Sequence, residues 1–294
     1  MKNKGIKEFK LFSDYKKAIK EELKDNLRVI YTDLDGTLLN DRGCLIKDNE
    51  NSFFTDSIDL IHKAEKKGWD TVIVSGRSRD QLRTSAMLMG LKNYISELGC
   101  EIVYNLGKEV HATFDTGSFN YEITKGGKDL VKIIKILKEA FPGKIESRIE
   151  WSLNRSYNAL FVGEIDIDMA NEMLNNNGYG GLILANNGFS KMFDAGLDVN
   201  NLIIYNLMPS GVDKSTGIRA DKKTRRINSG NCIALGDSAE DIKMAKEVSA
   251  FFLMRDSLEK NPQIQDLIKN YDNIYITEEK MNRGWVEVIK YLAD

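Results

Sequence analysis

The sequence is poor in the residues on which many metal sites and disulfide-stabilised folds depend. Its 294 residues include two histidines, His62 and His111, and three cysteines, Cys44, Cys100 and Cys232. The cysteines form no C-x-x-C pair, so neither a disulfide framework nor a thiol-rich zinc site is expected. Two distant histidines give little support to a zinc centre or to a triad with a histidine base. The chemistry of this protein must therefore rest mainly on carboxylates, hydroxyls and lysines.

Charge and hydrophobic runs exclude further classes of protein. The 42 lysines and arginines nearly balance the 44 aspartates and glutamates, which leaves a net charge of −2. This balance gives no reason to expect a nucleic acid or a membrane surface as a partner. No apolar run approaches the roughly 18 residues of a membrane span. The N-terminus has lysines but lacks the apolar stretch of a signal peptide, so we expect a cytoplasmic protein. The oligomeric state is not indicated.

Short apolar strands alternate with helical segments at both ends of the chain. Strands are predicted over 27–31 and 71–74, and helices over 57–67 and 79–89. The same alternation resumes with a strand at 202–207, a helix at 214–227, a strand at 232–235 and a helix at 240–248. Strands and helices that alternate with short links are typical of a parallel sheet covered on both faces. A preceding amphipathic helix over 6–24 is expected to pack on this sheet.

The middle of the chain has a different pattern. A possible hairpin near 95–114 is followed by a strong amphipathic helix at 127–140, strands at 145–153, 159–165 and 181–185, and a helix at 168–174. This mixture predicts a separate α+β unit. We therefore expect an α/β fold, with a doubly wound, Rossmann-like parallel-sheet core and an inserted cap domain. The expected ranges are 1–26 for an N-terminal helical extension, 27–114 and 201–294 for the core, and 115–200 for the cap.

The first chemical motif follows the first core strand and reads Asp33-Leu34-Asp35-Gly36-Thr37. Side chains alternate along a strand, so Asp33 and Asp35 are expected on the same side at its carboxyl end. Paired carboxylates repel unless a cation or a shared proton compensates them, and Mg²⁺ prefers such oxygen ligands. Gly36 and Thr37 allow a sharp turn whose N–H groups can meet an anion.

Two further motifs supply groups that bind anions. Ser75-Gly76-Arg77 places a hydroxyl and backbone N–H groups at a strand end, although Ser75 could simply cap a helix and Arg77 could form a structural salt bridge. Lys214 stands at the start of a predicted helix, where the helix dipole disfavours a cation, so an anion to neutralise would explain it. A solvated surface lysine is the alternative, with Lys191 and Lys222 as rivals for the anion-binding role.

The last motif, Gly236-Asp237-Ser238-Ala239-Glu240-Asp241, joins a strand to a helix. Asp237 ends the strand, and Asp241 lies four residues later on the same helix face. The two carboxylates suit a metal and a nearby lysine, although Asp241 could serve only the helix N-terminus.

In this order, the four motifs resemble the haloacid dehalogenase superfamily of phosphotransferases. The pattern is D-x-D-G-T-L at 33–38, a serine at 75, a lysine at 214 and G-D-x-x-x-D at 236–241. The insert between serine and lysine is similar to the C2-type caps of Cof-type and sucrose-phosphatase-like sugar phosphatases. Glu240 departs from the asparagine that Cof-type members usually carry there.

The resemblance implies a role for each motif. Asp33 would be the nucleophile, forming an aspartyl-phosphate, and Asp35 the general acid and base. Asp33, the backbone carbonyl of Asp35 and Asp237 would hold Mg²⁺. Ser75, Gly76 and Lys214 would bind the phosphoryl oxygens, and the supporting residues would be Asp241, Gly36 and Thr37.

The cap is expected to choose the substrate. Arg77, Arg155 and Asn187 are candidate contacts, and Glu97 lies where relatives carry a polar residue near the active site. The sequence thus predicts an Mg²⁺-dependent phosphatase of a small phosphorylated metabolite, with a sugar phosphate favoured. A phosphomutase of the same superfamily and a non-catalytic sugar-phosphate-binding regulatory protein remain as alternatives.

Overall fold

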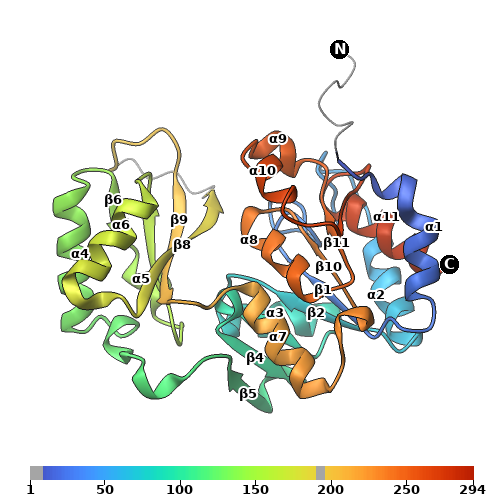
Figure 1. Ribbon diagram of the computed structural model, residues 1–294, viewed down its shortest axis with the longest axis horizontal. Helices are drawn as coiled ribbons and strands as arrows, with labels where there is room; N and C mark the ends of the chain where they lie inside the picture. The colour runs from blue at the N-terminus through green and yellow to red at the C-terminus, as the bar shows by residue number, and fades with distance from the viewer. Residues whose placement is uncertain (1–8, 190–195) are drawn as a thin grey trace.

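The structure is a computed structural model that describes residues 9–189 and 196–294 (Figure 1). It contains two sheets: eight strands in the order β12-β11-β10-β1-β2-β3-β4-β5, and four in the order β6-β7-β9-β8. In Figure 1 the small sheet and its helices lie on the left, and the large sheet with its helices lies on the right. The strand ends of the large sheet position the candidate site.

Six neighbouring strands of the large sheet are parallel, and two more extend it in antiparallel fashion. The parallel strands are β12 (Ile274–Ile276), β11 (Ala250–Leu253), β10 (Cys232–Gly236), β1 (Val29–Thr32), β2 (Asp70–Val74) and β3 (Tyr94–Ser96). The expected hairpin near 95–114 is confirmed as β4 (Glu101–Tyr104) and β5 (Glu109–Ala112), antiparallel to its neighbours. Strands β1, β2 and β10 are almost wholly buried, which explains their continuous apolar sequences.

Helices cover both faces of this sheet, so the predicted doubly wound α/β core is confirmed. One apolar cluster joins the sheet to helices on one face, which are α1 (Phe12–Leu23), α2 (Asp56–Lys66), α3 (Arg79–Met89) and α11 (Met281–Ala293). A second cluster joins the opposite face to α7 (Lys214–Arg225), α8 (Ala239–Ile242) and α10 (Ile264–Ile268). The short helix α9 (Ser257–Lys260) follows β11. Within the described residues no helix is long and apolar enough to cross a bilayer.

Helix α1 shows why the amphipathic pattern near the N-terminus produces a packed element. It buries Phe12, Ile19 and Leu23, which are spaced by seven and four residues and so lie on one face. Phe12 meets Phe252 of β11 edge to face, with ring centroids 5.3 Å apart. The expected helix began at residue 6, whereas α1 begins at Phe12, and residues 6–8 lie outside the described part of the chain.

The small sheet is entirely antiparallel. Its strands are β6 (Ile145–Ser147), β7 (Ala159–Gly163), β8 (Leu182–Phe189) and β9 (Ile203–Pro209). Helices α4 (Lys128–Ala140) and α6 (Ile167–Leu174) bury their apolar sides against the sheet, in a cluster that includes Leu137, Phe161 and Leu174. This separate core explains why the middle of the chain loses the βα alternation.

The strand expected over 202–207 in the core exists, but it belongs to the small sheet. As β9 it lies between β7 and β8 and pairs with both. The chain returns to the large sheet only after the turn that precedes α7. An isolated apolar strand carries no signal for its sheet, because the same side chains would suit either core. The small unit therefore extends past residue 200, to the end of β9.

Two predicted elements are shorter than expected. The strand over 145–153 ends at Ser147, and a helical turn, α5 (Ile149–Ser152), follows it. There the Ser152 hydroxyl donates to Arg148 O and accepts from Leu160 N, so a polar side chain redirects the backbone. The helix over 240–248 is α-helical only to Ile242 and continues as 3₁₀ turns over Lys243–Glu247.

Candidate active site

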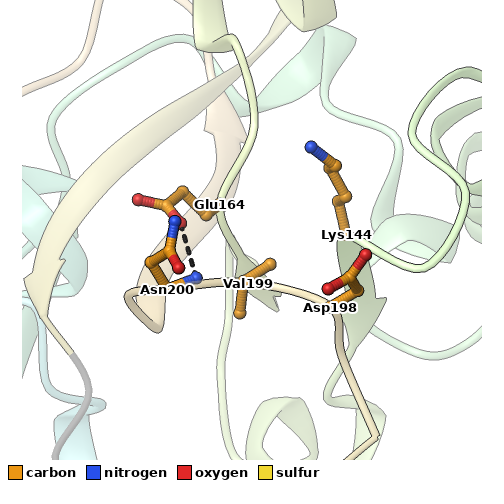
Figure 2. Close-up of a pocket in the computed structure, with 5 residues that line it drawn as sticks. All are labelled: Lys144, Glu164, Asp198, Val199 and Asn200. Carbon is orange, nitrogen blue, oxygen red and sulfur yellow. Dashed lines mark hydrogen bonds between the residues drawn. The ribbon is translucent and has the colours of Figure 1, made fainter.

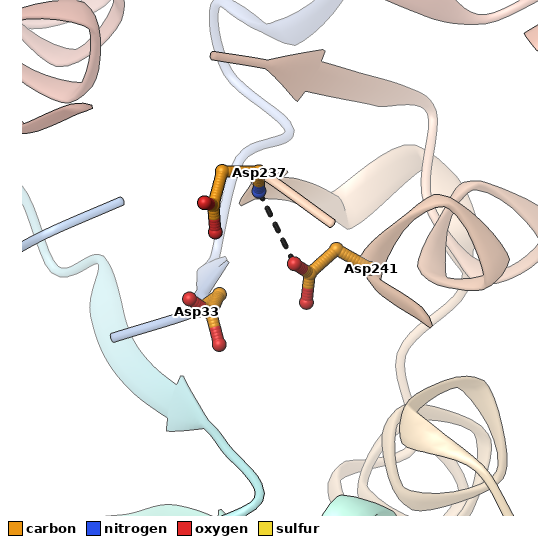
Figure 3. A group of neighbouring side chains, drawn as sticks. All are labelled: Asp33, Asp237 and Asp241. Atoms are coloured by element: carbon orange, nitrogen blue, oxygen red, sulfur yellow. Dashed lines mark hydrogen bonds between the residues drawn. The ribbon is translucent and has the colours of Figure 1, made fainter. Parts of the chain in front are cut away.

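Three carboxylates meet at the carboxyl ends of β1 and β10. Asp33 follows β1, Asp237 follows β10, and Asp241 lies in α8 (Figure 3). One oxygen atom from each of the three carboxylates lies within 4.8 Å of one oxygen atom from each of the other two. Neighbouring parallel strands end at one edge of a sheet, which is where open α/β folds bind ligands. The structure thus brings together three acids that the sequence analysis expected at this edge.

Lys214 is buried between two of these acids. Its Nζ atom donates to Asp33 Oδ1 and to Asp241 Oδ1, at 2.5 Å in each case, and the residue is 3% exposed. Burial alone would lower the pKa of Lys214, but the charges of Asp241 and Asp33 raise it well above its usual value. Lys214 therefore stays an ammonium. Of its rivals, Lys222 donates instead to Ser229 Oγ and Glu247 O, and Lys191 lies outside the described residues.

The cluster carries more negative charge than its lysine neutralises. Burial raises the pKa of Asp33, and Asp241 adds to this rise while Lys214 opposes it. Burial also raises the pKa of Asp237 well above its usual range, helped by the charges of Asp33 and Asp241. The ammonium of Lys260 is 3.9 Å from Asp237 Oδ2 and closer, at 2.6 Å, to Asp256. Buried carboxylates with incomplete compensation fit a hard divalent cation such as Mg²⁺.

The turn after Asp35 fixes the position of Asp237. Gly36 has a φ of 90°, and a Cβ atom there would lie 2.5 Å from Asp237 Oδ2. Only glycine allows both this backbone and this close approach. Thr37 Oγ1 donates to Asp237 Oδ1 at 3.3 Å. Gly36 and Thr37 therefore hold a carboxylate of the cluster from the neighbouring strand end.

Asp241 links the cluster to the start of α8. Its Oδ2 atom accepts from Asp237 N at 3.1 Å, as Figure 3 shows, and from Ser238 N at 2.9 Å. Ser238 caps the helix and accepts from Asp241 N in return. One oxygen of Asp241 is thus used by the helix start and the other by Lys214, so both alternatives considered for this residue hold together.

The Ser75-Gly76-Arg77 loop contributes a hydroxyl and an ion pair. Ser75 is buried, and its Oγ atom accepts from Arg77 N at 3.3 Å. The Arg77 guanidinium binds Asp35 with two parallel bonds, Nε to Oδ2 at 2.8 Å and Nη2 to Oδ1 at 2.5 Å. The structural salt bridge considered for Arg77 is therefore present, and its partner is the second acid of the first motif.

Two residues of the small unit reach Gly76. A Cβ atom on Gly76 would lie 2.5 Å from Asn187 Oδ1, so Asn187 rests directly against this glycine. Arg155 Nη1 donates to Gly76 O at 2.8 Å. Sequence reasoning singled out both residues as substrate contacts and did not foresee that Arg155 binds the loop itself. It also missed Asn158 and Lys260, which belong to no motif that marks a site.

A separate hollow of about 380 Å³ lies at the other end of β7 from these contacts. It is lined by Lys144, Glu164, Asp198, Val199 and Asn200 (Figure 2). Glu164 accepts from the backbone N–H of Asn200 at 2.9 Å, and hydrogen bonds from Asn201 lower the pKa of this carboxyl. Glu164 is already used to hold the loop of this hollow, whereas the carboxylate cluster gathers three acids beside a buried lysine, so the cluster is the candidate active site.

Comparison with known proteins agrees with this geometry. The chain matches the model of the haloacid dehalogenase-like hydrolases over residues 30–157 and 191–274, and it belongs to this family. The predicted superfamily is therefore confirmed. The matched segments contain all four motifs and are interrupted within the small unit.

Individual relatives are distant but cover nearly the whole chain. A glucosyl-3-phosphoglycerate/mannosyl-3-phosphoglycerate phosphatase of Persephonella marina is 26% identical, over 89% of this chain and 95% of that protein. A phosphoglycolate phosphatase of Sulfolobus acidocaldarius is 24% identical, over 90% and 96%. The solved sucrose-phosphatase of Synechocystis, in complex with sucrose and phosphate, has a TM-score of 0.63 at 14% identity, over 91% and 98%. Family and relatives confirm the predicted class of enzyme, a phosphoric monoester hydrolase.

Proposed function

We propose that this protein is an Mg²⁺-dependent phosphatase that passes a phosphoryl group from a small phosphomonoester to Asp33 and then to water. The observation that carries this proposal is the buried ammonium group of Lys214, which donates to both Asp33 and Asp241 at 2.5 Å. Phosphoryl transfer depends mainly on positioning and on neutralising negative charge, and this cluster provides both.

Asp33 is the proposed nucleophile. One of its oxygens is bound by Lys214, which leaves the other to attack phosphorus and form an aspartyl-phosphate. Asp35 is the proposed general acid, which protonates the leaving oxygen, and afterwards the base that takes a proton from the attacking water. Its ion pair with Arg77 holds the carboxylate in one orientation beside the loop, and this pair has to open before Asp35 can carry the proton of a general acid.

Mg²⁺ is the proposed cofactor. Asp33, the carbonyl of Asp35 and Asp237 are the proposed ligands, and the raised pKa of Asp237 supports a missing positive charge beside it. When bound, the ion would offset charge on the phosphoryl oxygens and on the carboxylates. Asp241 stays with Lys214 and the α8 cap, which supports an orienting role instead of direct ligation.

The proposed phosphate-binding groups are the Ser75 hydroxyl, the loop N–H groups near Gly76, and Lys214. Ser75 is buried and directly follows β2, and the loop leads to the N-terminus of α3, the end of a helix that favours an anion. The predicted N-cap role goes instead to Ser78, whose side chain accepts from Gln81 N. Ser75 is therefore free of the capping duty considered for it.

The small unit is the proposed cap. It places Asn187 against Gly76, where the leaving group of a phosphate ester would lie. Two relatives are named as phosphatases of glucosyl-3-phosphoglycerate and mannosyl-3-phosphoglycerate and of phosphoglycolate, which are small, polar phosphomonoesters. We therefore retain a sugar phosphate or a similar small metabolite as the substrate class. We also retain the cytoplasmic setting, which three unpaired cysteines support.

The test is phosphate release from a panel with Mg²⁺. The panel contains glucosyl- and mannosyl-3-phosphoglycerate, phosphoglycolate, sucrose phosphate, hexose phosphates and a small aryl phosphate. We expect release from at least one sugar-type ester, its loss in EDTA, and its return with added Mg²⁺. Full activity in chelator contradicts the metal. Turnover only in the presence of a bisphosphate activator indicates a mutase, and binding without release indicates a regulatory protein.

A further inference from the structure

A carboxylate of the large unit holds the backbone of the small unit. Glu97, in the turn between β3 and β4, is fully buried. Its Oε1 atom accepts from Ser156 N at 2.7 Å and its Oε2 atom accepts from Tyr157 N at 3.0 Å. Asn158 Nδ2 donates to the backbone carbonyl of Glu97 at 3.3 Å. Three consecutive residues before β7 are thus bound to one residue of the core turn.

A guanidinium of the small unit makes the reverse contact. Arg155 Nη1 donates to Gly76 O at 2.8 Å and to Asn158 Oδ1 at 3.0 Å. The charges of Glu97 and Arg155 also attract one another. Each unit therefore places one charged side chain on the backbone of the other, and both contacts involve the segment 155–158.

These contacts control the carbonyl groups of the phosphate loop. Ser75 O accepts from Leu98 N at 3.1 Å, Gly76 O accepts from Arg155 and Arg77 O accepts from Glu97 N at 3.0 Å. In a planar trans peptide the N–H points opposite to the C=O. Binding the Ser75 and Gly76 carbonyls therefore directs the N–H groups of the next residues, Gly76 and Arg77, away from these partners. The Arg77 N–H then points toward Ser75 Oγ, at 3.3 Å, which is itself a proposed phosphate-binding group. The small unit holds the second of these peptides, between Gly76 and Arg77, through Arg155.

We propose that Glu97 and Arg155 form a latch between the two units, and that docking of segment 155–158 sets the Gly76–Arg77 peptide for binding the phosphoryl group. Glu97 and Arg155 are positioning residues in this scheme, since neither needs to touch the substrate. The inference rests on the proposed function, because it assigns the latch to the loop that we propose binds phosphate.

The surroundings of the latch make it costly to break some of its hydrogen bonds while the two units stay packed together. The turn at 97–100 lies in an apolar cluster that joins the two units and includes Leu98, Cys100, Met208 and Val212, with Tyr157 packed against it. A carboxylate without its N–H partners would be costly in such a place, and so would a guanidinium without its carbonyl. Arg79 adds a peripheral contact, since its Nη2 atom donates to Ser156 Oγ at 2.8 Å.

The first test compares Glu97→Gln with Glu101→Gln. Glu101 is also buried and charged and lies four residues away. It contacts the Ser96 hydroxyl and Arg79, and it reaches segment 155–158 only through the peripheral Arg79–Ser156 side-chain contact, so it controls for that contact without the Glu97 hydrogen bonds. The readouts are the inhibition constant of inorganic phosphate and KM for a small aryl phosphate. We expect Glu97→Gln to raise both about tenfold, the change that one lost hydrogen bond of roughly 1.4 kcal/mol produces. Glu101→Gln is expected to change neither by more than about twofold.

The second test uses Arg155→Lys, Arg155→Met and the double variant with Glu97→Gln. We expect Arg155→Met to raise KM for small and large substrates alike, Arg155→Lys to restore part of the loss, and the double variant to be no worse than the stronger single one. Additive losses, or a loss confined to large substrates, would overturn the latch.

Hydrogen exchange supplies a readout that does not depend on turnover. The amides of Ser156 and Tyr157 are expected to exchange faster in Glu97→Gln than in the unmutated protein, and to be unchanged in Glu101→Gln. If Glu97→Gln does not fold, Arg155→Lys provides the same kinetic readouts. Unchanged phosphate inhibition in a folded latch variant contradicts the latch alone, whereas an unmutated protein without turnover contradicts the proposed function.

Discussion

Two turns of one β-ribbon have nearly the same backbone and very different surroundings. In the turn between β3 and β4, residues 97–99 have φ angles of 53°, 57° and 102°. In the turn between β4 and β5, residues 105–107 have φ angles of 50°, 59° and 104°. The sequences are Glu-Leu-Gly and Asn-Leu-Gly. The first turn is buried against the phosphate loop and the start of α7, and the second lies at the opposite end of β4 with its glycine exposed.

The comparison separates what a local sequence decides from what its position decides. A glycine in third place allows the left-handed backbone in both turns. A Cβ atom on Gly107 would meet nothing within 4 Å, whereas one on Gly99 would lie 2.0 Å from Asp213 O. The same turn is therefore a simple reversal at one end of the strand, and at the other end it is a packing element of the candidate active site.

The largest expected effect comes from adding a methyl group to each glycine. Gly107→Ala should cost about 1 kcal/mol in the free energy of unfolding, since only the backbone is strained. Gly99→Ala should cost more than about 4 kcal/mol or prevent folding, because a backbone carbonyl occupies the space. Urea unfolding of both variants measures the difference. Equal costs would mean that the first turn is not packed as described.

The first turn packs against Asp213, the residue before Lys214, so it borders the cation of the carboxylate cluster. Lys214→Met removes the cation between Asp33 and Asp241, and we expect kcat to fall about 10²- to 10³-fold. Lys222→Met is the matched control, since Lys222 is also buried in α7 but binds Glu247. The control should lower the free energy of unfolding and change kcat by no more than about threefold. Similar losses of kcat in both variants would refute the assignment of Lys214.

The smallest expected effect is a pH dependence of stability. It arises from Glu97 in the first turn, where the second turn has the uncharged Asn105. Burial raises the pKa of Glu97 from 4.5 to about 7, although the Ser156 and Tyr157 N–H groups and Arg155 oppose the rise. Because the pKa of Glu97 is raised in the folded state, the protonated side chain contributes its full stabilisation below pH 4.5. This contribution is lost as the pH rises through about 7. The free energy of unfolding, measured relative to Glu97→Gln, should therefore fall between pH 4.5 and 8, by roughly 3 kcal/mol at most. A difference that is constant with pH would contradict the raised pKa.

The fold and the carboxylate cluster were readable from the sequence because their signals are local. Asp33 and Asp237 each follow a short apolar strand, and parallel strands end at one edge, so their meeting follows from topology. The superfamily pattern then supplied the order of the four motifs. A structural salt bridge of Arg77 was one of two alternatives that the sequence left open, and its partner, Asp35, was not predicted.

The position of β9 and the contacts of Glu97 were not readable. Strand β9 has an apolar sequence that fits either sheet, and only its partners β7 and β8 decide between them. Glu97 binds the backbone N–H groups of Ser156 and Tyr157, about sixty residues away, and backbone groups leave no trace in the sequence. Contacts of a side chain with distant backbone require the three-dimensional structure.

The proposed mechanism depends most on Asp33, so its decisive measurement is the turnover of Asp33→Asn with Mg²⁺ on the best substrate from the panel. Thermal unfolding checks that the variant is folded. We expect a rate at least about 10³-fold below that of the unmutated protein, because an amide cannot form the aspartyl-phosphate. A folded Asp33→Asn variant that turns over within about tenfold of the unmutated rate would contradict the assignment of Asp33 as the nucleophile.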